Sequence, residues 1–169
     1  MRPSKFYYHF KSKIILSLLI ILFSYPVYSA GSDSGNSGKS SANISKSTYY
    51  YDALKLIKKN SFTAAVENLN KAEKNQKKDA DIYNYLGFSY RKMGNMKLAA
   101  VNYEKALDID PKHKGALEYQ GEMYITLGQL DKAKINLKKL SNICFLGCSE
   151  EKTLKKSISN SQKGIKSTY

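Results

Sequence analysis

The chain has 169 residues, a length that suits one domain with tails, and 42% of them are hydrophobic although Trp is absent. A core must therefore be built from Leu, Ile, Ala and the 14 Tyr. The 28 Lys and Arg outnumber the 14 Asp and Glu, and nearly all of the resulting charge of +14 comes from Lys. Nucleic-acid grooves more often combine Arg with interleaved aromatic residues, so we expect no nucleic-acid partner. At most, the charge predicts a weak association with an anionic membrane surface.

Residues 1–29 have the pattern of a secretory signal peptide. An apolar run, residues 14–23, is about 10 residues long, whereas a bilayer span needs about 20. Pro26 then breaks any helix before it can lengthen, and Val27 and Ser29 predict cleavage after Ser29. We therefore expect an exported, periplasmic protein. The alternative is an uncleaved N-terminal anchor. The basic residues that precede the apolar run are Arg2, Lys5, Lys11 and Lys13.

Residues 30–45 form a second segment, which is rich in Gly and Ser and has almost nothing to bury. Such a composition is typical of a flexible linker. It separates the leader from the part of the chain that can fold.

A 34-residue pattern organises residues 46–147. In its clearest copy, residues 80–113, the pattern reads Tyr83-x2-Leu86-Gly87-x2-Tyr90, then Ala99-x3-Tyr103-x2-Ala106, then Pro111. This copy resembles the tetratricopeptide repeat (TPR), a helix–turn–helix unit, and the same frame fits residues 46–79 and 114–147. The resemblance implies an all-α fold, a right-handed α-solenoid of three TPR units with a C-terminal capping helix. About three units are needed for stability.

Small residues recur at two positions of the frame where neighbouring helices come closest. The eighth position holds Ala53, Gly87 and Gly121, and the twentieth holds Ala65, Ala99 and Ala133. The turns within the units fall at Asn60, Gly94 and Gly128, residue types that tolerate the left-handed conformation that ends a helix. These signals predict helices over residues 46–58, 62–75, 80–92, 96–109, 114–126 and 130–142.

The last segment, residues 148–169, is predicted to be a capping helix and a tail. Ser149 suits a helix N-cap, and Glu150 and Glu151 suit the positive end of the helix dipole. Leu154 and Ile158 supply a thin apolar stripe that can cover the last unit. We expect this helix over residues 149–160.

The two cysteines, Cys144 and Cys148, lie in Cys-Phe-Leu-Gly-Cys, just before the capping helix. In an oxidising compartment an even number of cysteines favours a structural disulfide. A reactive pair is the alternative, because a helix N-terminus lowers a thiol pKa, and it would make the chain a thiol–disulfide or cytochrome-biogenesis accessory. Two cysteines lack the further ligands of a zinc site, and His113 lies a whole repeat away, so no metal is expected.

The TPR resemblance implies a concave groove lined by the first helix of each unit, which binds a peptide or a partner helix of another protein. Tyr50 and Leu54 stand where one TPR subtype has the Lys and Asn that grip a C-terminal carboxylate, so that mode is not expected. Ten groove residues are carried over from the family pattern: Tyr50, Leu54, Ile57, Asn84, Phe88, Arg91, Lys92, Glu118, Glu122 and Ile125.

No arrangement of residues in the sequence predicts catalysis. Apart from the leader the chain has one His, His113, which stands in a loop between units and is expected to be a surface residue. The chain also lacks a phosphate-binding Gly loop, because its Gly residues belong to the linker or to turns. We therefore expect a binding module without enzymatic activity or cofactor.

Overall fold

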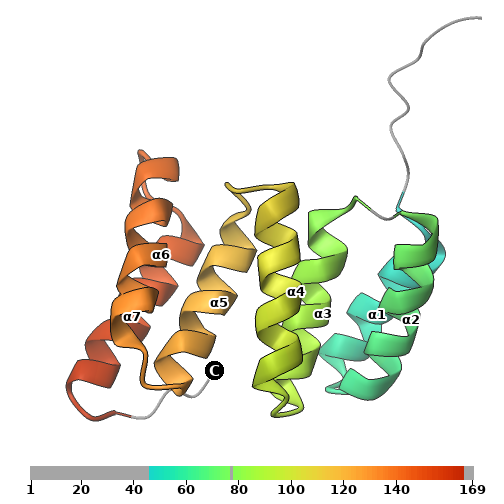
Figure 1. Cartoon of the computed structure of the whole chain (residues 1–169), viewed down its shortest axis with the longest axis horizontal. Coiled ribbons are helices and arrows are strands. Elements are labelled where there is room, and N and C mark those ends of the chain that lie inside the picture. The colour runs from blue at the N-terminus through green and yellow to red at the C-terminus, as the bar shows by residue number, and fades with distance from the viewer. Residues whose placement is uncertain (1–45, 77, 166–169) are drawn as a thin grey trace, which may run out of the picture. The chain divides into compact units, whose positions relative to one another are not determined.

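The computed structural model describes residues 46–76 and 78–165. The predicted signal peptide, the linker and the end of the tail lie outside the described residues. All regular structure within those ranges is helical (Figure 1). The helices are α1 (Thr48–Lys58), α2 (Phe62–Asn75), α3 (Ala80–Lys92), α4 (Met96–Ile109), α5 (Lys114–Thr126), α6 (Leu130–Ile143) and α7 (Ser149–Gln162).

Three helix pairs follow one another along the chain, α1–α2, α3–α4 and α5–α6, and each pair packs as a hairpin. Packing of α2 on α3 and of α4 on α5 joins neighbouring pairs, and α3 also contacts α5. The turns within pairs lie at one edge of the stack, and the connections between pairs lie at the other (Figure 1). This arrangement confirms the predicted α-solenoid of repeated helical units.

The turn within each pair has the same backbone geometry. Asn60, Gly94 and Gly128 have φ values of 57°, 80° and 72°. In each turn the next residue returns an N–H to the carbonyl five residues earlier, at 2.9 Å for Ser61 to Leu56, for example. Such bonds satisfy carbonyls at a helix end, which explains why all three pairs reverse direction at the same frame position.

Two helical glycines permit the closest contacts between helices. A Cβ atom added to Gly87 would lie 2.7 Å from the ring of Tyr103 on α4. A Cβ added to Gly121 would lie 2.6 Å from the Leu154 side chain on α7. Ala53, at the equivalent position of the first pair, is fully buried. The small eighth residue is therefore a packing requirement.

The capping helix α7 completes the core of the last pair. It packs on α5 and α6, where Leu154 is fully buried and Ile158 nearly so. Together with Leu117 and Leu140 they form one apolar cluster, so the apolar face of α5–α6 is covered. A second cluster joins the first two pairs, and a third lies between α4 and α5 around Tyr103.

Helix ends differ from the sequence predictions in three places. α1 starts at Thr48, two residues late, with Ser47 as its N-cap. α6 and α7 extend one and two residues beyond the predicted 142 and 160. The prediction of Ser149 as N-cap is wrong, because Cys148 has the extended N-cap backbone and Ser149 begins the helix. The Ser149 hydroxyl donates instead to Glu150, at 3.0 Å.

Candidate binding face

The structure separates the ten predicted groove residues by burial. Lys92 is exposed, and Leu54, Ile57 and Phe88 are partly buried. The other six are buried, namely Tyr50, Asn84, Arg91, Glu118, Glu122 and Ile125. Since a partner binds to surface that it can reach, Phe88 and Lys92 on α3 become the centre of the candidate face.

Phe88 lies in a row of aromatic rings that crosses three helices. Its ring centroid is 5.0 Å from that of Tyr119 on α5 and 6.2 Å from that of Phe62 at the start of α2. Aromatic rings at such separations attract one another and provide rigid contact area. We refer to Phe62, Phe88 and Tyr119 as the aromatic row.

Two cations lie near the middle of the aromatic row. The Lys92 ammonium is 5.9 Å and the Arg91 guanidinium carbon 5.6 Å from the centroid of the Phe88 ring. Both distances allow a cation–π interaction. Because Lys92 is exposed, the face combines an aromatic surface with an accessible positive charge.

Arg91 itself belongs mainly to the interior, since only 5% of it is exposed. It interacts with the hydroxyl of Tyr103, whose pKa is raised by burial although the Arg91 charge and hydrogen bond oppose the rise. Arg91 therefore links the candidate face to the core beneath it. Its removal would disturb both, which makes it a poor probe of binding alone.

Glu118 and Glu122, two of the predicted groove residues, are buried in α5, with Glu122 fully so. Gln120 of α5 and Asn136 of α6 are also buried polar residues. The Asn136 amide donates to the Gln120 side chain at 2.9 Å and to the Leu117 carbonyl at 3.1 Å, which joins α6 to α5. Since Glu118 and Glu122 are buried, they contribute little acidic surface to the candidate face.

A second aromatic group lies on the first two pairs. The ring of Tyr50 is 5.4 Å from that of Tyr51 and 6.0 Å from that of Tyr85. The predicted groove residues did not include Tyr51, Tyr85 and Tyr119, although each is the sixth residue of its unit. Their 34-residue spacing was a signal that could have found them. Phe62 had no such signal, because its equivalents are Met96 and Leu130.

An ionic joint connects the start of the first pair to the two connections between pairs. Lys46 forms ion pairs with Asp79, at 3.0 Å, and with Asp81. The Nε2 atom of His113 lies 2.9 Å from the other Asp81 oxygen. The hydrogen bond from His113 is the main reason why the pKa of Asp81 lies well below its usual range. The hydrogen bond and the positive charge of Lys46 lower this pKa further, although burial opposes both effects.

His113 also caps α5, because its Nδ1 accepts the Ala116 N–H at 3.0 Å. The other ring nitrogen, Nε2, must therefore carry the proton that is donated to Asp81. The expectation of a surface residue is wrong, since only 13% of this side chain is exposed. Because both ring nitrogens make hydrogen bonds within the protein, His113 has a structural role.

A cleft of about 600 Å³ lies beside the ionic joint, lined in part by Lys46, Asp79 and Ile109.

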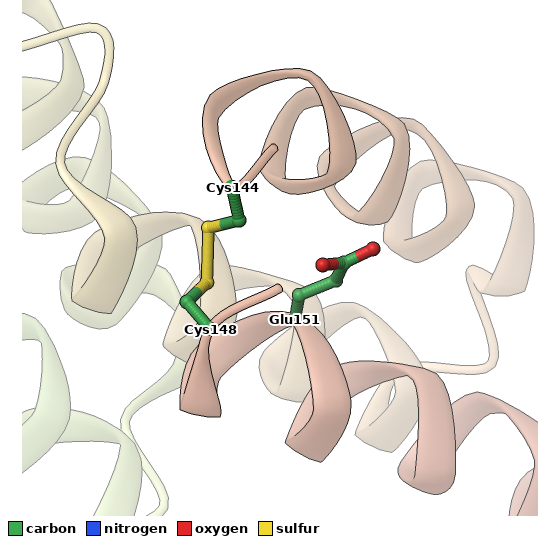
Figure 2. Close-up of side chains that lie close together, drawn as sticks. All are labelled: Cys144, Cys148 and Glu151. Carbon is green, nitrogen blue, oxygen red and sulfur yellow. A yellow bond between two sulfur atoms is a disulfide. The ribbon is translucent and has the colours of Figure 1, made fainter. Parts of the chain in front are cut away.

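The two sulfur atoms of Cys144 and Cys148 are joined, with a Cα–Cα distance of 5.6 Å (Figure 2). The Glu151 carboxylate lies near them, and one ligand atom from each of the three residues falls within 4.8 Å of the others. Bonded sulfurs provide no thiolate, and three groups are fewer than the four ligands of a structural zinc site. Glu151 accepts a hydrogen bond from the Ser141 hydroxyl, at 2.6 Å. The cluster therefore fits a link between α6 and α7 better than a metal site.

Among the helices of the described region, none combines the length and the apolar character needed to cross a bilayer.

Comparison with known proteins matches the repeat region to two family models. The model described as "Tetratricopeptide repeat" matches residues 80–113, and that described as "TPR repeat" matches residues 53–94. The first match coincides with the copy of the pattern that is clearest in the sequence. No curated protein matches the chain significantly.

Solved structures with the same fold include two TPR domains. The first TPR domain of Spaghetti (RPAP3), bound to the HSP90 peptide SRMEEVD, has a TM-score of 0.59 and 15% identity, and the match covers 68% of this chain and 90% of that one. The P58(IPK) TPR domain also has a TM-score of 0.59, with 19% identity, over 68% of this chain and 32% of that one. At such identities the likeness concerns the fold alone.

Proposed function

Because the chain belongs to the tetratricopeptide repeat family, we propose that it is a non-enzymatic protein-interaction module, a scaffold or assembly factor that binds a peptide or partner helix. The observation that carries this proposal is the aromatic row with the exposed cation of Lys92 beside it. Rigid aromatic side chains and nearby cations are typical of the few residues that dominate binding energy at interfaces.

The chemistry of the face also suggests the kind of segment that it binds. A large apolar side chain can pack on Phe88 and Tyr119, and an adjacent carboxylate can pair with Lys92. We therefore propose a partner segment with an apolar anchor next to Asp or Glu. The absence of a carboxylate clamp at Tyr50 and Leu54 means that the segment need not be a C-terminus.

Fluorescence polarisation with two labelled peptides tests this proposal. Both carry a Phe or Leu anchor, flanked by Glu in one and by Lys in the other. We expect the Glu peptide to bind more tightly. A Phe88→Ala/Lys92→Ala variant should weaken its binding at least about tenfold, since loss of a hot-spot side chain costs more than about 1.4 kcal/mol.

A matched control is Val101→Ala/Lys97→Ala on α4, which removes an exposed apolar residue and another exposed Lys. It should bind like the wild type. Equal binding of both peptides, or equal effects of both double variants, would contradict the assignment of this face. Cross-linking and mass spectrometry of exported material would then identify the natural partner and the helix that it contacts.

We also propose that the module acts after export, in a bacterial periplasm. The support is the sequence of residues 1–29 and the cysteine pair, because disulfides persist in oxidising compartments. The intact mass of the protein isolated from the periplasm tests this, with Ala30 expected as the first residue. A full-length mass in the membrane fraction would favour the uncleaved anchor instead.

A further inference from the structure

The loop between α6 and α7 carries the most exposed apolar side chains of the described region. Phe145 is 94% and Leu146 92% exposed, whereas the next large apolar residue, Ile135, is 57% exposed. We call residues 144–148 the stapled loop, because the Cys144–Cys148 link closes its base. The loop follows the C-terminus of α6, whereas the aromatic row lies on α2, α3 and α5.

The backbone of the stapled loop presents these two side chains outward. The Gly147 N–H donates to the Cys144 carbonyl at 2.7 Å, which makes Phe145 and Leu146 the central residues of a tight turn. Such positions favour Gly, Pro, Asn, Asp or Ser. Phe and Leu contribute neither turn chemistry nor core packing here, so the fold itself does not account for them.

Lysines outnumber acidic residues around the stapled loop. A Cβ added at Gly147 would lie 3.7 Å from the Lys152 side chain, so this lysine lies against the loop. Two acids, Glu150 and Glu151, also lie near the loop and accept hydrogen bonds from Ser149 and Ser141, which leave their negative charges in place. The exposed lysines of the adjoining turns of α6 and α7 are Lys138, Lys139, Lys152, Lys155 and Lys156.

The lysines lie at a suitable depth behind the tip. With a rise of 1.5 Å per helical residue, the backbones of these lysines lie roughly 6–12 Å along α6 and α7 from the cysteines at the base of the loop. Long Lys side chains can extend their ammonium groups along an apolar surface toward a charged layer. Between residues 138 and 156, five Lys face two Glu, a net charge of +3.

We propose that the stapled loop docks the protein on an anionic lipid bilayer, with Phe145 and Leu146 inserted among the acyl chains and the lysines on the lipid phosphates. Two side chains cover far less than the roughly 800 Å² per partner of a stable protein interface. A membrane interface, in contrast, gains affinity from a small apolar insertion of about 5–10 Å combined with nearby basic residues. The docked loop leaves the aromatic row free for a protein partner.

The absence of Trp from the chain allows a test that reports on the loop alone. The variant Phe145→Trp of the full chain is added to phosphatidylcholine vesicles with or without phosphatidylglycerol, some containing brominated lipid. This readout distinguishes the loop from residues 14–23, whose apolar run also favours membranes. We expect a blue shift and bromine quenching on the anionic vesicles and a much smaller effect on the neutral ones.

Two further variants complete the test. Tyr51→Trp places the probe at an exposed position of α1, and its emission should stay unshifted and unquenched on the same vesicles. In the Phe145→Trp background, Lys152→Gln/Lys155→Gln/Lys156→Gln should weaken the vesicle affinity by up to about a hundredfold, since each Lys near the surface contributes roughly fivefold. The proposal is overturned if Phe145→Trp stays unquenched on vesicles that bind the chain, if Tyr51→Trp responds equally, or if only a protein partner shifts the emission. Failure of this test leaves the peptide-binding results unaffected, and the reverse also holds.

Discussion

The central helix pair and the last one follow the same 34-residue frame, yet different helices fill the space over their glycines. In the central pair, Tyr103 of the same unit packs against Gly87. In the last pair, Leu154 reaches Gly121 from α7, a helix outside the repeat frame. The central pair thus closes over its glycine within its own unit, and the last pair needs a helix of different sequence. In a solenoid each unit buries its apolar face on its neighbours, so the final unit requires a substitute for the missing one.

Truncation of Leu154 on α7, the helix that replaces a fourth unit, should have the largest effect on stability. Leu154→Ala removes a fully buried side chain, and we expect the free energy of unfolding to fall by about 2–5 kcal/mol. Urea titration followed by circular dichroism measures this loss. Leu98→Ala, at a 39% exposed position on α4, serves as the control and should cost less than about 1 kcal/mol. In Leu154→Ala, amide hydrogen exchange should become faster first in α5–α7. An equal loss of protection in α1–α2 would mean that the array unfolds as a single cooperative unit.

Gly87→Ala tests the central pair. The added Cβ meets an aromatic ring that is fully buried, and we expect a loss of about 1–3 kcal/mol. Gly121→Ala should cost less, because its added Cβ meets the flexible end of the Leu154 side chain and not a rigid ring. Thermal unfolding of both variants measures the difference. A larger loss for Gly121→Ala would show that α7 packs more rigidly than Tyr103.

The cysteine pair belongs to the closing of the last unit, and its removal should have a smaller effect. Cys144→Ser/Cys148→Ser opens a short loop, which lowers the free energy of unfolding by at most about 2 kcal/mol in the loop-closure model. Peptide binding at the aromatic row should stay unchanged. Loss of a cellular function with the heat stability intact would instead favour the thiol–disulfide alternative.

The ionic joint between the first and central units should have the smallest effect at neutral pH. Because Asp81 is 41% exposed, we expect Asp81→Asn to cost about 0.5–1 kcal/mol after allowance for solvent screening. The lowered pKa of Asp81 means that its stabilisation is present above the unfolded Asp pKa of about 3.9 and is lost as the pH falls through the folded value. The gap between wild type and variant, measured by urea titration at a series of pH values, should therefore narrow below about pH 4. A constant gap would assign the effect to packing.

Burial explains why the fold was more predictable than the candidate face. The frame positions of Gly87, Asn60 and Ala99 follow from local requirements: a close helix contact, a left-handed turn and a small residue. Whether Asn84 or Glu122 reaches the surface depends on how α3 and α5 pack together, and the structure buries both. Packing of α2 on α3 likewise makes Phe62, from a position without aromatic equivalents, a member of the aromatic row.

The sequence by itself determined the helices, their turns and the number of units, because helix propensity, glycine and small-residue spacing act over a few residues and repeat every 34. Only the tertiary structure decided which groove side chains stay accessible, that His113 pairs with Asp81, and that Leu154 fills the space over Gly121. His113 and Asp81, like Leu154 and Gly121, are more than 30 positions apart along the chain and meet only in the folded structure. No local pattern encodes such contacts, because each is set by the shape of the helix that packs opposite.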